Sequence, residues 1–302
     1  MKLPIKPMLL ATGGEPSDSS DRLFEVKLDG WRICIIKSGY RVDAYTRNGN
    51  CISHKFEQEL REVGASIKLP SVILDTEGIV LREHKESFED FSYRGRLNDP
   101  VKIRAATHTH PVSFVAFDVI ETDKDLTTTE LIERKQILED IIIPSSVITP
   151  IPYVIGQASH LWEVTRERGM EGIVSKPLKS KYLFDHRSLD QWRKHKHWKE
   201  LPCVILGYEL NPFSIIVGVR FRTTGLKEIA KVEYGFKPEE KQAFRGIAKE
   251  IHTTRTGSTQ WIEPRLVCNI RYQDRTDNHQ LRTTTFQGFN FDKKPEECVW
   301  LY

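Results

Sequence analysis

The sequence predicts an α+β protein that begins with antiparallel sheets flanked by helices. Residues 23–48 alternate apolar and polar side chains around Asp29-Gly30 and again around Ser38-Gly39, which is typical of consecutive strands joined by tight turns. Short runs rich in Val, Ile and Phe at 71–82 and 112–121 indicate buried strands. Helices are predicted at 53–63, 129–140 and 158–168, where apolar residues recur every three or four positions.

The last third of the chain has a different pattern, with about five short strands and one helix at 238–251, which suits a Greek-key barrel of the OB type. Before it, residues 199–203 place a charged pair and a proline after a basic segment. We therefore expect two domains, residues 1–200 and 201–302.

Composition narrows the class of protein. The 302 residues carry a net charge of +3, and the whole excess lies in residues 201–302. This excess is too small to establish nucleic-acid binding by itself. The five cysteines are scattered without CxxC spacing, and no apolar run approaches the roughly 20 residues that span a bilayer. We therefore expect a soluble protein of a reducing cytoplasm, with no membrane partner.

The stretch from Glu25 to Arg32 contains a candidate nucleophile, Lys27, beside the Asp29-Gly30 turn. A lysine attacks an electrophile only as the neutral amine, and its ordinary pKa is about 10.4. Burial and neighbouring cations would lower that pKa. Taken alone, the same stretch is also compatible with a hairpin that carries a solvated lysine.

Further motifs follow this lysine in a fixed order. They are Tyr45–Gly49, Leu74–Val80, Phe114–Ile120, Glu171–Pro177 and Gln191–Lys196. In this order and spacing the chain resembles the covalent nucleotidyltransferases, and most closely the ATP-dependent DNA ligases of the minimal bacterial and viral type. The resemblance covers nearly the whole chain.

The resemblance implies an ATP-grasp-like nucleotidyltransferase domain followed by an OB-fold domain. It also implies a reaction in three displacements: Lys27 takes AMP from ATP, AMP passes to the 5′-phosphate of nicked double-stranded DNA, and the 3′-hydroxyl expels it. We expect a monomer that finds DNA through backbone phosphates, so that binding is salt-sensitive and independent of sequence. If the source is bacterial, the protein would lie with the nucleoid.

Three basic residues would bind the phosphates of ATP: Arg47, Lys194 and Lys196. Lys194 and Lys196 alternate along a predicted strand and therefore point to one face. The other interpretation of residues 192–199 is a solvated basic surface.

Two glutamates are the candidate carboxylates. The resemblance assigns Glu77 to the ribose and Glu171 to a catalytic metal, with Glu77 as a second metal ligand. The metal is expected to be magnesium, which one or two carboxylates hold together with phosphate oxygens, and manganese is expected to substitute. Either glutamate could instead be an exposed residue at a strand edge.

The base and sugar complete the nucleotide site. Phe117 offers a flat face to adenine, although a phenylalanine in an apolar strand is more often part of a core. The resemblance gives Glu25 to the adenine amino group and Arg32 to the ribose or to the 5′-phosphate of the nick. A guanidinium suits a phosphate better than an ammonium does. Arg32 and Arg47 are therefore also candidate DNA contacts.

The chain departs from the ligase pattern at two motifs. Asp75-Thr76-Glu77 replaces Asp-Gly-Glu, which we interpret as a changed turn before Glu77. Asn290 occupies the place of an arginine in the C-terminal motif that orients the leaving pyrophosphate. Our hypothesis is that Lys293 or Lys294 carries this role, and both are candidate DNA contacts.

Other functions remain open at this point. An RNA ligase or an mRNA capping-type enzyme would share the lysine–nucleotide step, and a non-catalytic binding module would keep the fold alone. The residues do not distinguish repair from replication or mobile-element biology. For the active enzyme we expect a hinge near Lys199–Leu201 that lets the OB domain alternate between two positions.

Overall fold

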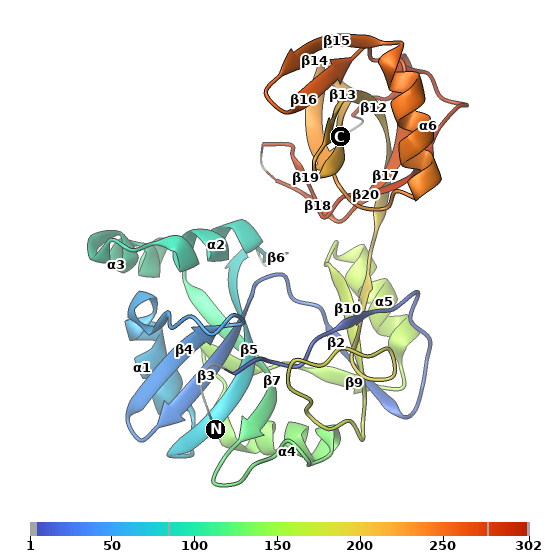
Figure 1. Cartoon of the computed structure of the whole chain (residues 1–302). Helices are drawn as coiled ribbons and strands as arrows, with labels where there is room; N and C mark the ends of the chain where they lie inside the picture. The colour runs from blue at the N-terminus through green and yellow to red at the C-terminus, as the bar shows by residue number, and fades with distance from the viewer. Residues whose placement is uncertain (1–4, 84, 277, 301–302) are drawn as a thin grey trace. The chain divides into compact units, whose positions relative to one another are not determined.

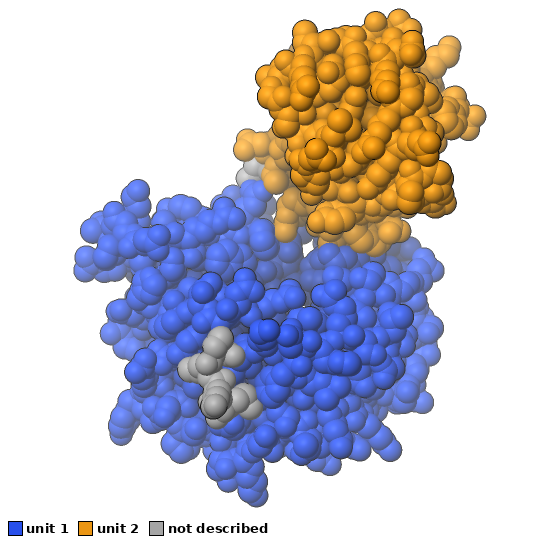
Figure 2. Space-filling model, in the orientation of Figure 1, with its two compact units in different colours: residues 1–196 blue, residues 197–302 orange. Residues whose placement is uncertain are grey.

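The computed structural model describes residues 5–83, 85–276 and 278–300. The chain divides into two compact units, residues 1–196 and 197–302, each described by itself below (Figure 2). The division follows Lys196 rather than residue 200. Strand β12 (Lys199–Leu210) already pairs at its first residues with β17 (Val267–Tyr272). The predicted hinge at Lys199–Leu201 therefore falls inside a paired strand.

The first sheet of unit 1 contains the strands that surround the largest apolar cluster of this unit. Its order is β4, β3, β5, β7 and β8, antiparallel except for the last pair. The bounds are Arg41–Thr46 for β4, Trp31–Ser38 for β3, Ser71–Arg82 for β5, Val112–Glu121 for β7 and Ile148–Pro150 for β8, and Lys85–Glu86 (β6) pairs with β5. The predicted strands at 71–82 and 112–121 are confirmed.

The second sheet of unit 1 has the order β1, β11, β10, β2 and β9, antiparallel except for β1 and β11. The bounds are Ala11–Thr12 for β1, Arg193–Lys196 for β11, Gly172–Pro177 for β10, Arg22–Val26 for β2 and Tyr153–Ile155 for β9. Among the described strands, the chain passes between the sheets twice, from β2 to β3 and from β8 to β9, so the second sheet combines segments from both ends of unit 1.

One such passage corrects the prediction of a hairpin at Asp29-Gly30. Strand β2 before it belongs to the second sheet, and β3 after it belongs to the first, so the two strands do not pair. Gly30 is required there by a close approach, because an added Cβ would lie 2.1 Å from the carbonyl oxygen of Gly78. The turn at Ser38-Gly39 does join the paired strands β3 and β4, as predicted.

The helices of unit 1 flank the sheets, with α1 beside β4 and α5 beside β10 (Figure 1). Their bounds are Glu57–Ser66 for α1, Phe88–Arg96 for α2, Pro100–Thr109 for α3, Leu131–Ile141 for α4 and Ala158–Glu167 for α5, with a 3₁₀ turn at Ser53–Lys55. Helices α2 and α3 were not predicted. Both begin at a capping side chain, Ser87 and Asp99 respectively, that accepts hydrogen bonds from backbone N–H groups.

Unit 2 is a strongly curled sheet of the OB type, and its described residues include one α-helix, α6 (Pro238–Lys249). Its long strand β12 pairs with β17 along residues 199–204 and with β16 at Gly207 and Tyr208. The other bounds are Phe213–Phe221 for β13, Gly225–Val232 for β14, His252–Thr256 for β15, Thr259–Ile262 for β16, Asp274–Arg275 for β18, Leu281–Arg282 for β19 and Thr285–Phe289 for β20, with a 3₁₀ turn at Pro295–Glu297. The β15–β16 hairpin was not predicted.

The five cysteines differ in their exposure. Cys51 is exposed, and the other four are buried and have free thiols. Burial raises the pKa of Cys34, Cys203 and Cys268. Within the described parts of the chain, none of the helices is both long and apolar enough to cross a membrane.

Candidate active site

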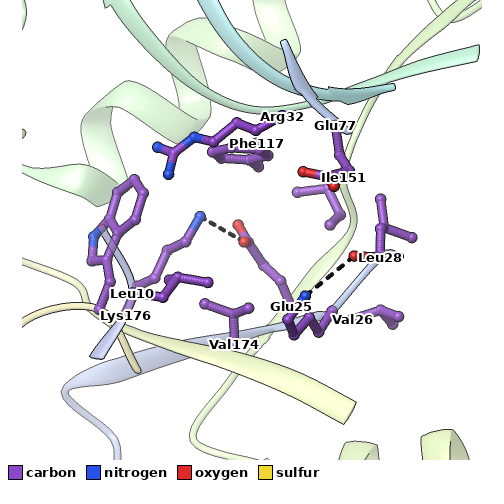
Figure 3. Close-up of a pocket in the computed structure, with 12 residues that line it drawn as sticks. Leu10, Glu25, Val26, Leu28, Arg32, Glu77, Phe117, Ile151, Val174 and Lys176 are labelled. Atoms are coloured by element: carbon purple, nitrogen blue, oxygen red, sulfur yellow. Dashed lines mark hydrogen bonds and ion pairs between the residues drawn. The ribbon is translucent and has the colours of Figure 1, made fainter. Parts of the chain in front are cut away.

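The two sheets of unit 1 line an open pocket, with about 460 Å³ of space when its mouth is included (Figure 3). Its walls come from both sheets and the loops between them: Leu10, Glu25, Val26, Lys27, Leu28, Arg32, Glu77, Phe117, Ile151, Val174, Lys176 and Trp192. The sequence-predicted Glu25, Lys27, Arg32, Glu77 and Phe117 are thus brought together.

One end of the pocket is a buried cluster around Glu25. Lys176 Nζ lies 2.6 Å from Glu25 Oε2, and Lys135 Nζ contacts Oε1. All three side chains are at most 3% exposed. The amine of Lys176 also lies 4.2 Å from the ring centroid of Trp192 and 4.7 Å from that of Phe117. Burial lowers the pKa of Lys176 to about 8, although the charge of Glu25 opposes this shift.

The other end carries the candidate nucleophile. Lys27 follows β2, and its N–H donates to the carbonyl of Gly172, which places its side chain beside Glu171. Lys27 Nζ lies 2.5 Å from Glu171 Oε2, and Lys196 Nζ lies 2.7 Å from Oε1. The side chain of Lys27 remains 18% exposed, so the amine is within reach of a bound ligand.

The ion pair overturns the expectation that neighbouring cations lower the pKa of Lys27. Burial would lower this pKa, but the negative charges of Glu171, Glu77 and Asp29 outweigh burial and raise it. The charges of Lys27 and Lys196 in turn lower the pKa of Glu171 against the effect of its burial. In this arrangement Lys27 is an ammonium ion, and it becomes a nucleophile only after its proton is lost.

Glu77 lies at the Lys27 end, where its charge interacts with those of Lys27 and Glu171. It stands opposite Arg32 in the β3–β5 pairing, and its Oε1 accepts the N–H of Gly30 at 3.2 Å. Burial raises the pKa of Glu77 to about 7, against the charges of Lys27 and Arg32, and Glu171 contributes a further rise. A divalent cation near both carboxylates would remove that repulsion, so this donor set fits a hard cation that keeps water and phosphate ligands. Within the described ranges, no cluster of three or more His, Cys, Asp or Glu is placed to hold a metal ion.

The side chain of Arg32 is bound by residues outside the pocket lining. Its guanidinium donates to both oxygens of Asp75, at 2.9 and 2.5 Å, and to the carbonyl of Met8. The phenolic O–H of Tyr182 donates to the same carboxylate at 2.5 Å. Arg32 also lies 5.2 Å from the ring centroid of Phe117. The guanidinium therefore borders the pocket in a fixed orientation.

The motif that contains Asp75 and Glu77 forms no turn, contrary to our interpretation. Both residues lie within β5, and Thr76 Oγ1 between them donates to the carbonyl of Ile33 at 2.8 Å. The pairing of β5 with β7 shifts register between Asp75 and Thr76. The threonine is thus accommodated by a strand irregularity, and Glu77 still points into the pocket.

Six predicted residues lie outside the pocket lining. Two of them, Glu171 and Lys196, form the ion pairs beside Lys27 that are described above. Lys194 is half-buried on β11, and burial together with the charges of Lys196 and Lys27 lowers its pKa. Arg47 is exposed just after β4. Lys293 and Lys294 belong to unit 2, in the turn that follows β20.

Asn290 shapes this C-terminal turn. Its side-chain oxygen accepts the N–H groups of Asp292 and Lys293, and its amide donates to Asn269 Oδ1 at 3.0 Å. These hydrogen bonds stabilise the turn, which explains why an asparagine suits position 290.

Sequence reasoning missed several residues of the site. Lys176 and Trp192 lie inside motifs that we had recognised, and Val174 and Lys176 share a strand face because they alternate along β10. This alternation was a usable signal. Asp75 and Lys135 carried no such signal, because their contacts join segments that are far apart in the chain.

The comparisons with known proteins agree with this geometry. A family model described as "ATP dependent DNA ligase domain" matches residues 14–196, and one described as "ATP dependent DNA ligase C terminal region" matches residues 212–293. The bifunctional non-homologous end joining protein LigD of Bacillus subtilis (strain 168) is 29% identical over 99% of this chain and 51% of its own length. The SPbeta prophage-derived DNA ligase-like protein LigB of the same strain is 24% identical over 94% of this chain and 98% of its own.

The chain is also similar to solved structures of DNA ligases. A mycobacterial DNA ligase D complexed with ATP and MES has 26% identity, covers 98% of both chains and has a TM-score of 0.57. A structure from work on the minimal scaffold of Lig E DNA ligases has a TM-score of 0.63 at 16% identity, with 94% of this chain and 99% of that chain covered, which shows a shared fold. The chain spans 51% of the Bacillus LigD and 39% of the LigD of Mycolicibacterium smegmatis.

Proposed function

The chain belongs to the ATP-dependent DNA ligases, and on that premise we propose that it seals nicks in duplex DNA through an AMP group carried on Lys27. In the first step, the neutral amine of Lys27 attacks the α-phosphorus of ATP. A P–N bond forms, the bond to the pyrophosphate oxygen breaks, and pyrophosphate leaves. An oxygen of the nick's 5′-phosphate then attacks the phosphorus of the AMP group, a P–O bond forms, and the P–N bond breaks to return the amine of Lys27. Finally, the 3′-hydroxyl attacks the 5′-phosphorus, the phosphodiester bond forms, and AMP leaves.

The observation that carries this proposal is the position of Lys27 in the pocket. Its amine lies beside one carboxylate, Glu171, and the pocket beyond it has apolar walls and a polar end. Glu171 is the acceptor at hand for the proton that the amine must lose. Lys196 and Lys194 then supply positive charge for the phosphates, whose displacement depends mainly on alignment and charge neutralisation.

The buried end of the pocket supports recognition of adenine. Glu25 can accept from the exocyclic amino group, and the ammonium of Lys176 can donate to a neighbouring ring nitrogen. Guanine presents a carbonyl oxygen and a ring N–H at these positions, so like groups would face each other. Phe117 and Val174 provide the flat and apolar contacts with the base, and Glu77 with Arg32 would contact the ribose.

We propose that Glu171 and Glu77 together hold a magnesium ion, for which manganese substitutes. When bound, the metal would supply charge that stabilises the phosphate oxygens during displacement. The residues of this chain contribute a pair of carboxylates in which burial and mutual repulsion raise the pKa of Glu77.

The DNA contacts are proposed from exposed basic residues. Arg47 is exposed beyond β4 and is available to a phosphate of the nick, and Arg32 borders the pocket from the adjacent strand. Since such contacts neutralise backbone phosphates, binding should weaken steeply with salt and should not depend on sequence. Exposure of Lys294 and partial exposure of Lys293 support a role for these residues in the ATP step or at DNA.

The names of the LigD relatives would extend the substrate from nicks to double-strand ends. We propose nick sealing as the core activity, performed by a monomer, with end joining as a further substrate to be tested. The dispersed free thiols support a reducing compartment such as the cytoplasm.

The experiment is a pulse and chase with one protein preparation. Incubation with α-³²P-labelled ATP and magnesium should label the protein, and a nicked duplex added next should remove the label as the nick is sealed. GTP in place of ATP tests for a capping-type enzyme, and an RNA strand on the 3′-hydroxyl side tests for an RNA ligase. Failure of ATP to label the protein, or label that no nicked duplex removes, would contradict the proposal.

A further inference from the structure

Lys135 lies outside the pocket lining yet reaches the carboxylate at its buried end. It comes from helix α4, its side chain is 1% exposed, and its amine contacts Glu25 Oε1 while Lys176 holds Oε2. Glu25 therefore has one partner inside the pocket and one behind it. Because the two ion pairs engage different oxygens, both lysines act on the orientation of the carboxylate group.

We propose that Lys135 is a positioning residue for nucleotide selection, which fixes Glu25 so that the pocket favours a base with an exocyclic amino group. This inference rests on the proposed function, since it assumes that the pocket binds ATP. Lys135 itself contacts no nucleotide in the proposal. Its effect passes through the orientation of one carboxylate.

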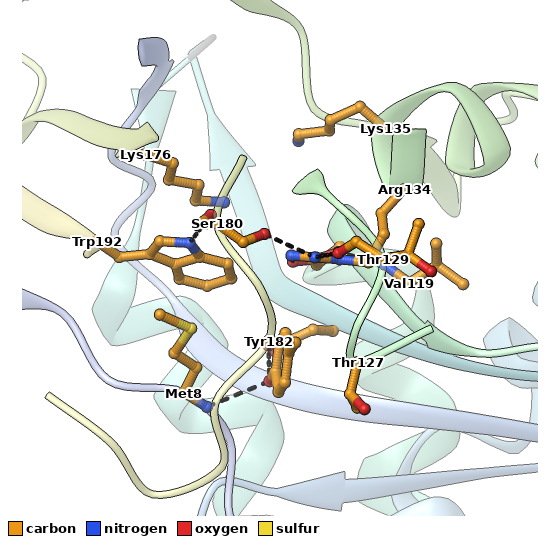
Figure 4. Close-up of polar contacts among 12 residues, drawn as sticks. Met8, Val119, Thr127, Thr129, Arg134, Lys135, Lys176, Ser180, Tyr182 and Trp192 are labelled. Carbon is orange, nitrogen blue, oxygen red and sulfur yellow. Dashed lines mark hydrogen bonds and ion pairs between the residues drawn. The ribbon is translucent and has the colours of Figure 1, made fainter. Parts of the chain in front are cut away.

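The helix that carries Lys135 is anchored through the residue before it. The preceding residue, Arg134, is fully buried and donates to both oxygens of Asp118 at 2.8 Å, and also to the carbonyls of Thr129 and Ser180 (Figure 4). Such bidentate pairs fix orientation as well as contributing energy. Position 135 is therefore held relative to the pocket by the adjacent residue.

The same helix connects the opposing walls of the pocket. Asp118 follows Phe117 on β7, in the first sheet, and Glu25 lies on β2, in the second. Ser180 takes part in two contacts. Its backbone carbonyl accepts from Arg134, and its hydroxyl oxygen accepts the indole N–H of Trp192 at 3.2 Å. Two consecutive residues of α4 thus anchor groups on both sides of the base.

The buried negative charge of Glu25 also accounts for a second lysine, Lys135. A carboxylate that is only 2% exposed is costly unless it is paired and its oxygens are contacted. Without Lys135, one oxygen of Glu25 loses its partner, and the carboxylate is free to turn toward Lys176. The acceptor that the adenine amino group needs would then point elsewhere.

The test combines a protein variant with a change in the ligand. The second-order rate constant of self-adenylation is measured with ATP and with purine riboside triphosphate, which lacks the 6-amino group, using intact-protein mass spectrometry. In the wild-type protein we expect a loss of about 10- to 100-fold on removal of the amino group, the range for a hydrogen bond to a charged partner. In Lys135→Met we expect the two nucleotides to differ by less than about 3-fold.

Controls separate positioning from folding. Lys135→Arg keeps the charge and should retain most of the discrimination, and Lys102→Met removes an exposed lysine of α3 and should leave it unchanged. A general loss of structure would slow both nucleotides equally and lower the melting temperature. If Lys135→Met does not fold, Lys135→Gln carries the same comparison.

The outcomes are distinct from those that test the ligase activity. If ATP does not label the wild-type protein, the proposed function fails. If ATP labels it but the wild type does not discriminate between the nucleotides, or Lys135→Met discriminates as well as the wild type, only the present inference is overturned.

Discussion

Each end of the pocket has one glutamate between two lysines, but the surroundings differ. We name the two ends the base end and the phosphate end after the roles proposed for them. At the base end, Glu25 lies between Lys135 and Lys176, and none of the three is more than 3% exposed. At the phosphate end, Glu171 lies between Lys27 and Lys196, whose side chains are 18% and 12% exposed. Burial lowers the pKa of Lys176, whereas at Lys27 nearby carboxylates outweigh burial and raise the pKa.

We propose that this difference separates a cluster that recognises the base from one that reacts with the phosphates. The base-end cluster is closed by rings and by a helix, and its groups are positioned before a ligand arrives. The phosphate-end cluster is more open and contains a second carboxylate, Glu77, so its ion pairs can rearrange when phosphates enter. In this proposal the same two residue types, glutamate and lysine, serve different roles because of burial and neighbouring charge.

The largest effect is expected when the lysine at each end of the pocket is replaced by alanine in separate variants. Lys27→Ala should abolish self-adenylation, by about 10⁴-fold or more, as expected for loss of a covalent nucleophile. Lys176→Ala should slow it by only about 10- to 100-fold, because a base contact is lost. Peptide mapping of the adduct checks this, and an adduct on Lys176 would reverse the assignment of the two ends.

The second prediction concerns Glu171→Gln. Loss of this carboxylate should slow self-adenylation by about 100-fold at neutral pH, as a proton acceptor and proposed metal ligand disappears. It should also lower the pKa of Lys27, so the rate should stop rising with pH at a lower pH than in the wild type. The matched control is Glu25→Gln, for which we expect weaker ATP use and an unchanged pH profile; equal shifts in both variants would remove the distinction between the ends.

A smaller effect is expected from unit 2. The double substitution of Lys293 and Lys294 by alanine should slow self-adenylation by about 10-fold, while sealing of a pre-adenylated nick stays within about 3-fold. The reason is that only the first step expels pyrophosphate. Equal slowing of both reactions would refute the proposed role in that step, and Lys237 and Lys241 changed together provide a control of the same charge.

The smallest effect is a change in stability at Glu77. Its pKa is raised from 4.5 to about 7, so between these values the folded state keeps a proton that the unfolded state has lost. The stability contributed by this group is therefore present below about pH 4.5 and is lost as pH rises through about 7. Compared with Glu77→Gln, the melting temperature of the wild type should fall by a few degrees across this window.

Magnesium gives the complementary measurement on Glu77. At pH 7.5 the metal should raise the melting temperature of the wild type more than that of Glu77→Gln, because the ionised carboxylate is one of its proposed ligands. A rise of the same size in both proteins would show that Glu77 does not hold the metal.

Strands with strong local signals were predicted well. The strands at 71–82 and 112–121 have runs of β-branched and aromatic residues, and their observed bounds are Ser71–Arg82 and Val112–Glu121. Helix α2 was missed because most of its residues are polar, and the sequence gives no sign that Asp90 and Arg94 are buried. Helix α3 was missed because its residues are mostly exposed and Ala106 alone is buried. The turn at Asp29-Gly30 was misassigned because local turn chemistry does not reveal which strands pair.

For the site, the sequence predicted which residues take part but not how their charges interact. Motif order located Lys27, Glu77 and Phe117, which do line one pocket. The pKa of Lys27 was predicted in the wrong direction because Glu171, 144 positions further along the chain, contacts its amine. Spacing in sequence identifies which charged groups are present, but their mutual distances depend on how the two sheets bring them together.

The unequal exposure of the cysteines has a practical consequence. Cys51 is the exposed thiol, and it follows the strand that precedes Arg47 and its proposed phosphate contact. A maleimide dye should therefore attach there without mutagenesis, since thiols with raised pKa values inside the protein react slowly. Quenching or polarisation of that dye would report the arrival of a duplex in real time.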